Sequence, residues 1–128
     1  IINIENSIYP EKLKKLKNPP QILYTMGNIE LLRTNGISII GSRKPTKYGE
    51  KMAKMFAKDL SLYGLTIVSG MAEGIDSFAH TATLEIQGKT IAVLPCGFNN
   101  IFPHKNIKYP FSAYSSAILC IFRTFGHV

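Results

Sequence analysis

The segment from Ile37 to Gly49, ISIIGSRKPTKYG, most constrains what this chain can fold into. A run rich in β-branched isoleucine ends abruptly at Gly41-Ser42-Arg43, and helical spacing begins a few residues later. This order predicts a short buried strand over 37–40, then a glycine turn, then a helix. In an open α/β sheet, ligands bind just beyond the carboxyl end of such a strand.

The predicted helix begins at Thr46, a good N-cap, and ends at Gly64, which suits the position after a helix. Its large apolar side chains recur every three or four residues, which is typical of an amphipathic helix with one apolar face. They are Met52, Phe56, Leu60 and Tyr63, with Ala53 and Ala57 beside them.

The same order of elements then repeats. A strand is predicted over 65–68, a second glycine turn over 69–74, a helix through Ile86, and a third apolar strand over 90–94 that ends at Pro95-Cys96-Gly97. Alternation of strands and helices predicts an α/β fold with a parallel sheet and right-handed crossovers. The three glycine-containing turns then share one edge of the sheet and line one crevice.

The first turn suits a phosphate group. Glycine lets the backbone approach a ligand, a helix start offers N–H groups to an anion, and an arginine can bind phosphate with two hydrogen bonds. Gly41, Ser42, Arg43 and Lys44 are therefore candidate phosphate-binding residues. The turn has neither the dinucleotide-binding glycine pattern nor the G-K-S/T of a P-loop, and a purely structural turn is the alternative.

The second turn, SGMAEGID, follows the same logic, and the Ser69 hydroxyl and the Gly70 backbone are candidate contacts. Asp76 can be a helix-capping carboxylate, a metal ligand or a base, and we favour the cap. His80 has no partner residue at metal or nucleophile spacing, so we expect a hydrogen-bonded structural histidine. Cys96 is expected to be a structural thiol rather than a nucleophile.

The charge balance favours an anionic partner. The 128 residues carry a formal net charge of +7, and the sequence pI is near 9.5. Nucleic acid is the commonest partner of such a chain, although a basic surface can also serve only solubility. The sequence shows no catalytic or metal-binding motif and no cofactor fingerprint, and no apolar stretch approaches the ~20 residues needed to span a bilayer. The absence of a disulfide framework suits a reducing compartment, so we expect a cytoplasmic protein.

Four stretches together resemble the DprA/Smf family, the DNA-processing proteins of bacterial transformation. They are PPQILYTMGN (19–28), GSRKPTKYG (41–49), SGMAEGIDSFAH (69–80) and GKTIAVLPCGFNNIFPHKN (88–106). The resemblance runs from about Tyr9 to Asn106. It implies a Rossmann-like three-layer fold, with an N-terminal extension containing short helices (1–36), a DNA-binding core (37–106) and a divergent tail (107–128). In that tail, helix and strand both fit residues 113–125.

The resemblance also implies function. It implies single-stranded DNA binding without catalysis, a homodimer in the full-length protein, and delivery of DNA to a RecA-type recombinase. The implied phosphate pocket consists of Gly41, Ser42, Arg43, Ser69, Gly70, Met71, Gly74, Asp76 and Gly97. The tail does not resemble the family's second half, which predicts an incomplete sheet from truncation or a frameshift. The alternatives are an inactive fragment and a nucleoside-monophosphate phosphoribohydrolase, but the P-G-G-x-G-T-x-x-E signature of those enzymes is absent.

Overall fold

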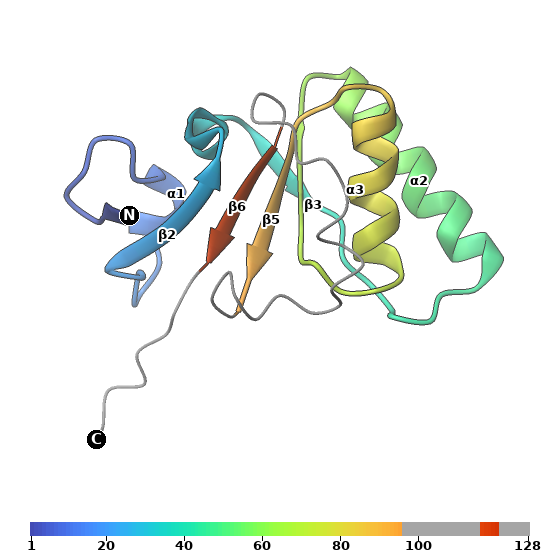
Figure 1. The fold of residues 1–128 in the computed structure, drawn as a ribbon, viewed down its shortest axis with the longest axis horizontal. Helices are drawn as coiled ribbons and strands as arrows, with labels where there is room; N and C mark the ends of the chain where they lie inside the picture. Colours follow the sequence, from blue (N-terminus) through green and yellow to red (C-terminus); the bar gives the residue numbers. More distant parts are fainter. Residues whose placement is uncertain (96–115, 121–128) are drawn as a thin grey trace.

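A six-stranded mixed sheet forms the centre of the fold (Figure 1). The computed structural model describes residues 1–95 and the backbone of the strand at 116–120. The strands lie in the order β1-β2-β6-β5-β4-β3. Their bounds are β1 Ile2–Asn3, β2 Ile22–Gly27, β3 Gly36–Ser38, β4 Thr66–Ser69, β5 Thr90–Leu94 and β6 Ser116–Cys120.

Strands β3, β4, β5 and β6 run parallel to one another, whereas β2 is antiparallel to both β6 and β1. The predicted α/β fold with a parallel sheet is therefore confirmed. The third predicted strand matches β5, and the other two differ by one or two residues. The expectation of a buried first strand is wrong, because β3 is exposed along its length. It lies at the edge of the sheet and pairs only with β4 among the described strands.

Two long helices cover one face of this sheet. Helix α2 (Lys47–Leu62) connects β3 to β4, and α3 (Ile75–Glu85) connects β4 to β5. Two right-handed crossovers that step in the same direction place both helices on the same face, where they lie side by side (Figure 1). Small side chains allow this close approach: the core between helices and sheet consists of Ala57, Ala79, Ala82 and Ile67.

The ends of α2 follow the sequence. Thr46 is the N-cap, and its hydroxyl accepts a hydrogen bond from the Gly49 N–H at 3.1 Å. The chain leaves the helix through Gly64, which has a φ of 85°. Glycine takes such positive φ values at little cost. Both boundary predictions are confirmed.

The opposite face of the sheet is covered by the N-terminal segments that lie outside β1 and β2. A short helix α1 (Glu11–Lys14) and a 3-10 helix η1 (Ile29–Arg33) lie there, and Asn28 caps η1. The buried side chains on this side are Ile2, Tyr9, Leu23, Leu31 and Ile91. Helical layers on both sides of a sheet give the expected three-layer architecture.

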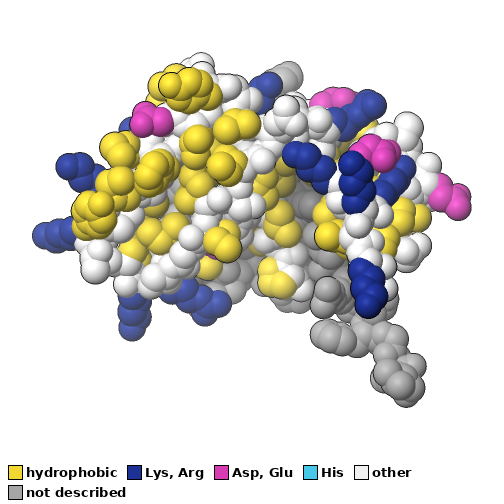
Figure 2. Space-filling model, turned by 180° about the vertical axis from the view of Figure 1, so that it is seen from behind, with side chains coloured by type: hydrophobic (Ala, Val, Ile, Leu, Met, Phe, Trp, Pro, Cys, Tyr) yellow, Lys and Arg dark blue, Asp and Glu magenta, His cyan; other side chains and the backbone are white. Residues whose placement is uncertain are grey.

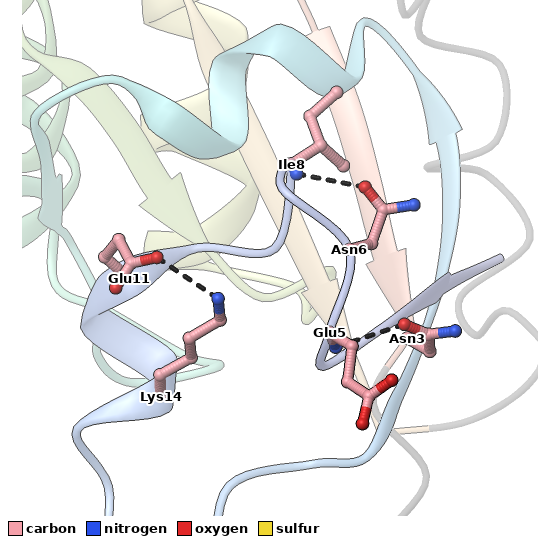
Figure 3. Close-up of polar contacts among 6 residues, drawn as sticks. All are labelled: Asn3, Glu5, Asn6, Ile8, Glu11 and Lys14. Carbon is pink, nitrogen blue, oxygen red and sulfur yellow. Dashed lines mark hydrogen bonds and ion pairs between the residues drawn. The ribbon is translucent and has the colours of Figure 1, made fainter.

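Local polar contacts shape the N-terminal segment (Figure 3). The Asn3 and Asn6 side-chain oxygens accept hydrogen bonds from the N–H groups of Glu5 and Ile8, at 3.1 and 3.0 Å. Such contacts are typical of Asx turns. Lys14 pairs with Glu11 across one helical turn at 3.2 Å. This lysine is therefore engaged locally, which agrees with a solvated helix face.

The apolar face of α2 is the main departure from the expected core. The residues that are fully buried on this helix are Ala53 and Ala57, whereas Phe56 is 50% and Tyr63 86% exposed. Phe56 and Tyr63 therefore face outward, whereas Met52 and Leu60 are partly buried and Leu60 packs against the core between helices and sheet. Figure 2 shows hydrophobic side chains gathered on the α2 side of the molecule, with lysine and arginine side chains around them.

The tail contributes a strand. Residues 116–120 form β6, which lies between β5 and β2 and joins the parallel part of the sheet to its antiparallel part. Strand is therefore the correct alternative for this part of 113–125. The division of the chain at residues 36 and 106 stays a prediction, although β2 and β5 now belong to one sheet.

Candidate nucleic-acid interface

The glycine turns lie at the carboxyl ends of β3 and β4, on the same edge of the sheet. In the first turn, Gly41, Ser42, Arg43 and Lys44 are all exposed. The Ser42 hydroxyl oxygen accepts a hydrogen bond from the Lys44 N–H at 3.1 Å. This contact fixes the turn immediately before α2 and leaves the hydroxyl hydrogen of Ser42 to donate elsewhere.

The first and second turns are in direct contact. The Ile75 N–H, at the start of α3, donates to the Ser42 carbonyl oxygen at 3.1 Å. Gly74, with a φ of 84°, packs so closely that an added Cβ would overlap the backbone of Ser42 and Arg43. A Cβ on Gly41 would in turn lie 2.8 Å from Ile75. The two turns therefore form one rigid unit, and the glycines make this approach sterically feasible.

Three other predicted residues lie deeper. Ser69, Met71 and Asp76 are buried, and the Ser69 hydroxyl donates to the Ile39 carbonyl oxygen at 2.5 Å. This bond ties the end of β4 to the chain leaving β3. These side chains support the turns from behind, whereas the partly exposed Gly70 lies nearer the surface. Gly97 lies outside the described residues, as does Cys96.

The expected capping role of Asp76 is wrong. The N-cap of α3 is Gly74, and Asp76 lies in the first turn of the helix, where its negative charge still favours the helix dipole. Its carboxylate lies against Gly70, because an added Cβ there would be 2.5 Å from Asp76 Oδ2. In the described part of the chain, no group of three or more His, Cys, Asp or Glu side chains could hold a metal ion.

The first turn carries cations that form no ion pair with the described residues. Lys54 pairs with Glu50 and Lys58 with Glu85, both at 2.9 Å. By contrast, no ion pair among the described residues involves Arg43, Lys44 or Lys47. Unpaired cations on an exposed turn raise the local potential for an anion, and the effect falls with added salt. The exposed Tyr48 next to them adds an aromatic surface.

His80 lies beneath the second turn and is only 3% exposed. Its Nε2 is 2.6 Å from the Gly70 carbonyl oxygen and its Nδ1 is 2.6 Å from the Thr90 hydroxyl. The prediction of a hydrogen-bonded structural histidine is confirmed. Burial lowers the pKa of His80, while the bond to Gly70 and the nearby Asp76 charge act in the opposite direction. Gly70 and Thr90 could not be identified as its partners from the sequence, because they lie on other elements of the fold.

The lowered His80 pKa makes stability depend on pH. Below the ordinary pKa of 6.5, the unfolded chain takes up a proton that the folded chain resists. The free energy of unfolding is therefore expected to fall as the pH is lowered from about 7 to about 5. Urea unfolding across this range measures the effect. In His80→Gln the slope should be smaller, and an unchanged slope would contradict the assignment to His80.

Comparison with known proteins now defines the family. Residues 1–121 match the family described as DNA recombination-mediator protein A. The chain belongs to this family. Among its members, DNA processing protein DprA of Bacillus subtilis is 38% identical over 108 residues, which are 84% of this chain and 36% of that protein. Protein Smf of Escherichia coli is 35% identical over 108 residues, or 84% of this chain and 29% of that protein.

Solved structures of the recombination-mediator family have the same fold. DprA of Streptococcus pneumoniae gives a TM-score of 0.84 at 34% identity, covering 93% of this chain and 42% of that one. DprA of Helicobacter pylori, whose structure was described for its single-stranded DNA binding mode, gives a TM-score of 0.79 at 35% identity. The match covers 99% of this chain and 58% of that one. The chain thus spans about a third of the length of the curated relatives it matches. None of the helices in its described part is both long and apolar enough to cross a membrane.

Proposed function

We propose that this chain binds single-stranded DNA without catalysis, by gripping phosphates at the unit formed by the two glycine turns. The observation that carries the proposal is the position of Arg43, which is exposed, lies in a turn fixed by hydrogen bonds on both sides, and has no ion-pair partner among the described residues. The fixed backbone of the turn positions the base of the Arg43 side chain, and the planar guanidinium can donate two parallel hydrogen bonds to one phosphate.

The neighbouring groups extend this contact along a strand. Lys44 and Lys47 supply further charge, and Tyr48 supplies an exposed ring on which a base can stack. Backbone and hydroxyl contacts to the phosphates come from Gly41, Ser42, Gly70 and Gly74. The turns that carry them are supported from behind by Ser69, Met71 and Asp76. The proposed site also includes Gly97. Contacts of this kind read the phosphate backbone and carry little base preference.

In the full-length protein we propose the wider role that the family resemblance implies. The Helicobacter pylori relative is described as binding single-stranded DNA, and the Bacillus subtilis relative as processing DNA. By this analogy, the full-length protein forms a cytoplasmic homodimer, acts in natural transformation and delivers single strands to a RecA-type recombinase. No cofactor or metal has a part in this function.

A fluorescence-anisotropy titration with a labelled single strand and the matching duplex tests DNA binding. We expect tighter binding to the single strand, and an affinity that falls steeply with salt. Each neutralised phosphate contributes a slope of about −0.7 to the plot of log K against log salt, so three cations predict about −2. Circular dichroism on the same sample controls for folding. Absence of binding by the folded chain, or binding insensitive to salt, would refute the phosphate grip.

A further inference from the structure

The buried His80 ring links the second glycine turn to the interior of the sheet. Nε2 lies 2.6 Å from the Gly70 carbonyl oxygen, and Nδ1 lies 2.6 Å from Thr90 Oγ1. Thr90 is on β5 and is itself fully buried. The ring thus connects residue 70, at the carboxyl end of β4, to the neighbouring strand.

The partners fix the tautomer of the ring. A carbonyl oxygen only accepts hydrogen bonds, so Nε2 must carry the hydrogen that faces Gly70. In the neutral ring, Nδ1 then accepts from the Thr90 hydroxyl. That hydroxyl also lies 2.8 Å from the Ile67 carbonyl oxygen. The Ile67 carbonyl oxygen is thus a second acceptor for the single hydrogen of this hydroxyl, but the Gly70 carbonyl oxygen requires a hydrogen on Nε2 whichever way the hydroxyl points.

The bond to Nε2 determines which way one peptide group of the turn faces. Because His80 is buried and Gly70 is partly exposed, the Gly70 carbonyl oxygen points inward. A glycine peptide rotates easily, since no Cβ restricts it. Without the bond to His80, the carbonyl oxygen could turn outward and present a negative partial charge to an anionic ligand. On the other side of Gly70, Asp76 Oδ2 restricts movement of the Cα atom.

We propose that His80, oriented by Thr90, is a positioning residue of the DNA site, and that its Nε2–H holds the Gly70 carbonyl oxygen away from the bound phosphate. This inference rests on the proposed function. His80 makes no contact with DNA in this arrangement and adds no charge to the site. Its loss should therefore weaken binding equally at all salt concentrations, whereas loss of a phosphate-binding cation also reduces the salt dependence.

The test compares His80→Leu and His80→Gln in the anisotropy titration. Leucine removes the donor, and the affinity of the folded variant for a single strand is expected to fall about tenfold, with an unchanged salt slope. Glutamine can place an N–H near the position of Nε2 and should recover most of the affinity. Thr83→Val is the matched control, because it also removes a buried hydrogen-bond donor from α3. The Thr83 hydroxyl donates to the Ala79 carbonyl oxygen and not to the glycine turn. Its affinity should equal that of the unchanged chain.

The ring nitrogens of the unchanged protein provide a second readout that needs no variant to fold. Nitrogen-15 NMR should show a neutral ring with hydrogen on Nε2 near neutral pH; a hydrogen on Nδ1 alone would overturn the proposal. A folded His80→Leu variant with unchanged affinity would overturn it as well. Absence of binding by the folded unchanged chain would instead refute DNA binding, and with it any role of His80 in that site.

Discussion

Replacing Gly74 with alanine is expected to destabilise the fold by about 4 kcal/mol. Two costs add at this position. Gly74 has a φ of 84° and a ψ of −129°, a conformation that is strained for any residue with a Cβ. The new Cβ would also overlap the carbonyl oxygens of Ser42 and Arg43, which are backbone atoms and cannot rotate away. Denaturant unfolding monitored by circular dichroism measures the loss.

Gly64 offers a matched control for the first of these costs. Its φ of 85° is nearly the same, but an added Cβ would meet nothing within 4 Å. Gly64→Ala should therefore cost only about 1 kcal/mol, from backbone conformation alone. A larger loss in Gly74→Ala than in Gly64→Ala reports the close contact between the glycine turns together with the ψ of −129° at Gly74. Equal losses would mean that this contact does not constrain the fold.

Replacing Arg43 with alanine is expected to lower affinity for single-stranded DNA at least about tenfold, whatever the base sequence. A hydrogen-bonded ionic contact to phosphate is lost, and one fewer counterion is released on binding. The plot of log K against log salt should therefore become shallower by about 0.7. Arg43→Lys keeps the charge but not the planar donor pair, so it should preserve the slope while losing part of the affinity.

Arg33 is the control for net charge in this experiment. It is exposed like Arg43, but it ends η1 before the amino end of β3, away from the carboxyl edge where the glycine turns lie. Arg33→Ala removes the same charge and should leave affinity and slope almost unchanged. If Arg33→Ala and Arg43→Ala weaken binding equally, the interaction is a general effect of net charge, and the phosphate site at the first glycine turn is incorrect.

Strand β3 lies at the edge of the described sheet, and the first glycine turn leads from it into α2. In doubly wound sheets with strand order 3-2-1-4-5-6, the ligand crevice lies where the order reverses, beside the first strand. Strands β5, β4 and β3 correspond to the 3-2-1 half of that order. In this sheet β3 is the edge strand among the described strands, so the first glycine turn lies at the carboxyl end of that edge, where Arg43 is exposed.

The local features of this fold could be predicted from sequence because each depends on neighbouring residues. The apolar runs and helical spacing gave the order of β3, α2, β4, α3 and β5, and Thr46 and Gly64 marked the ends of α2 through short-range backbone chemistry. The Gly41-Ser42-Arg43 turn, together with the three other matching stretches, indicated the family, and it marked the position of the exposed arginine.

Only the tertiary structure decided which surfaces meet. Close packing against α3 buries the alanine side of α2, although the side chains of Phe56 and Tyr63 have more apolar surface than those of the alanines. Other contacts also join segments that are distant in the sequence. Strand β6 lies between β5 and β2, Ile75 donates a hydrogen bond to Ser42, and His80 contacts Gly70 and Thr90. Sequence alone determined the order of β3, α2, β4, α3 and β5 and the two ends of α2, because these depend on adjacent residues. It could not determine these contacts, because they depend on how close whole helices and strands can pack.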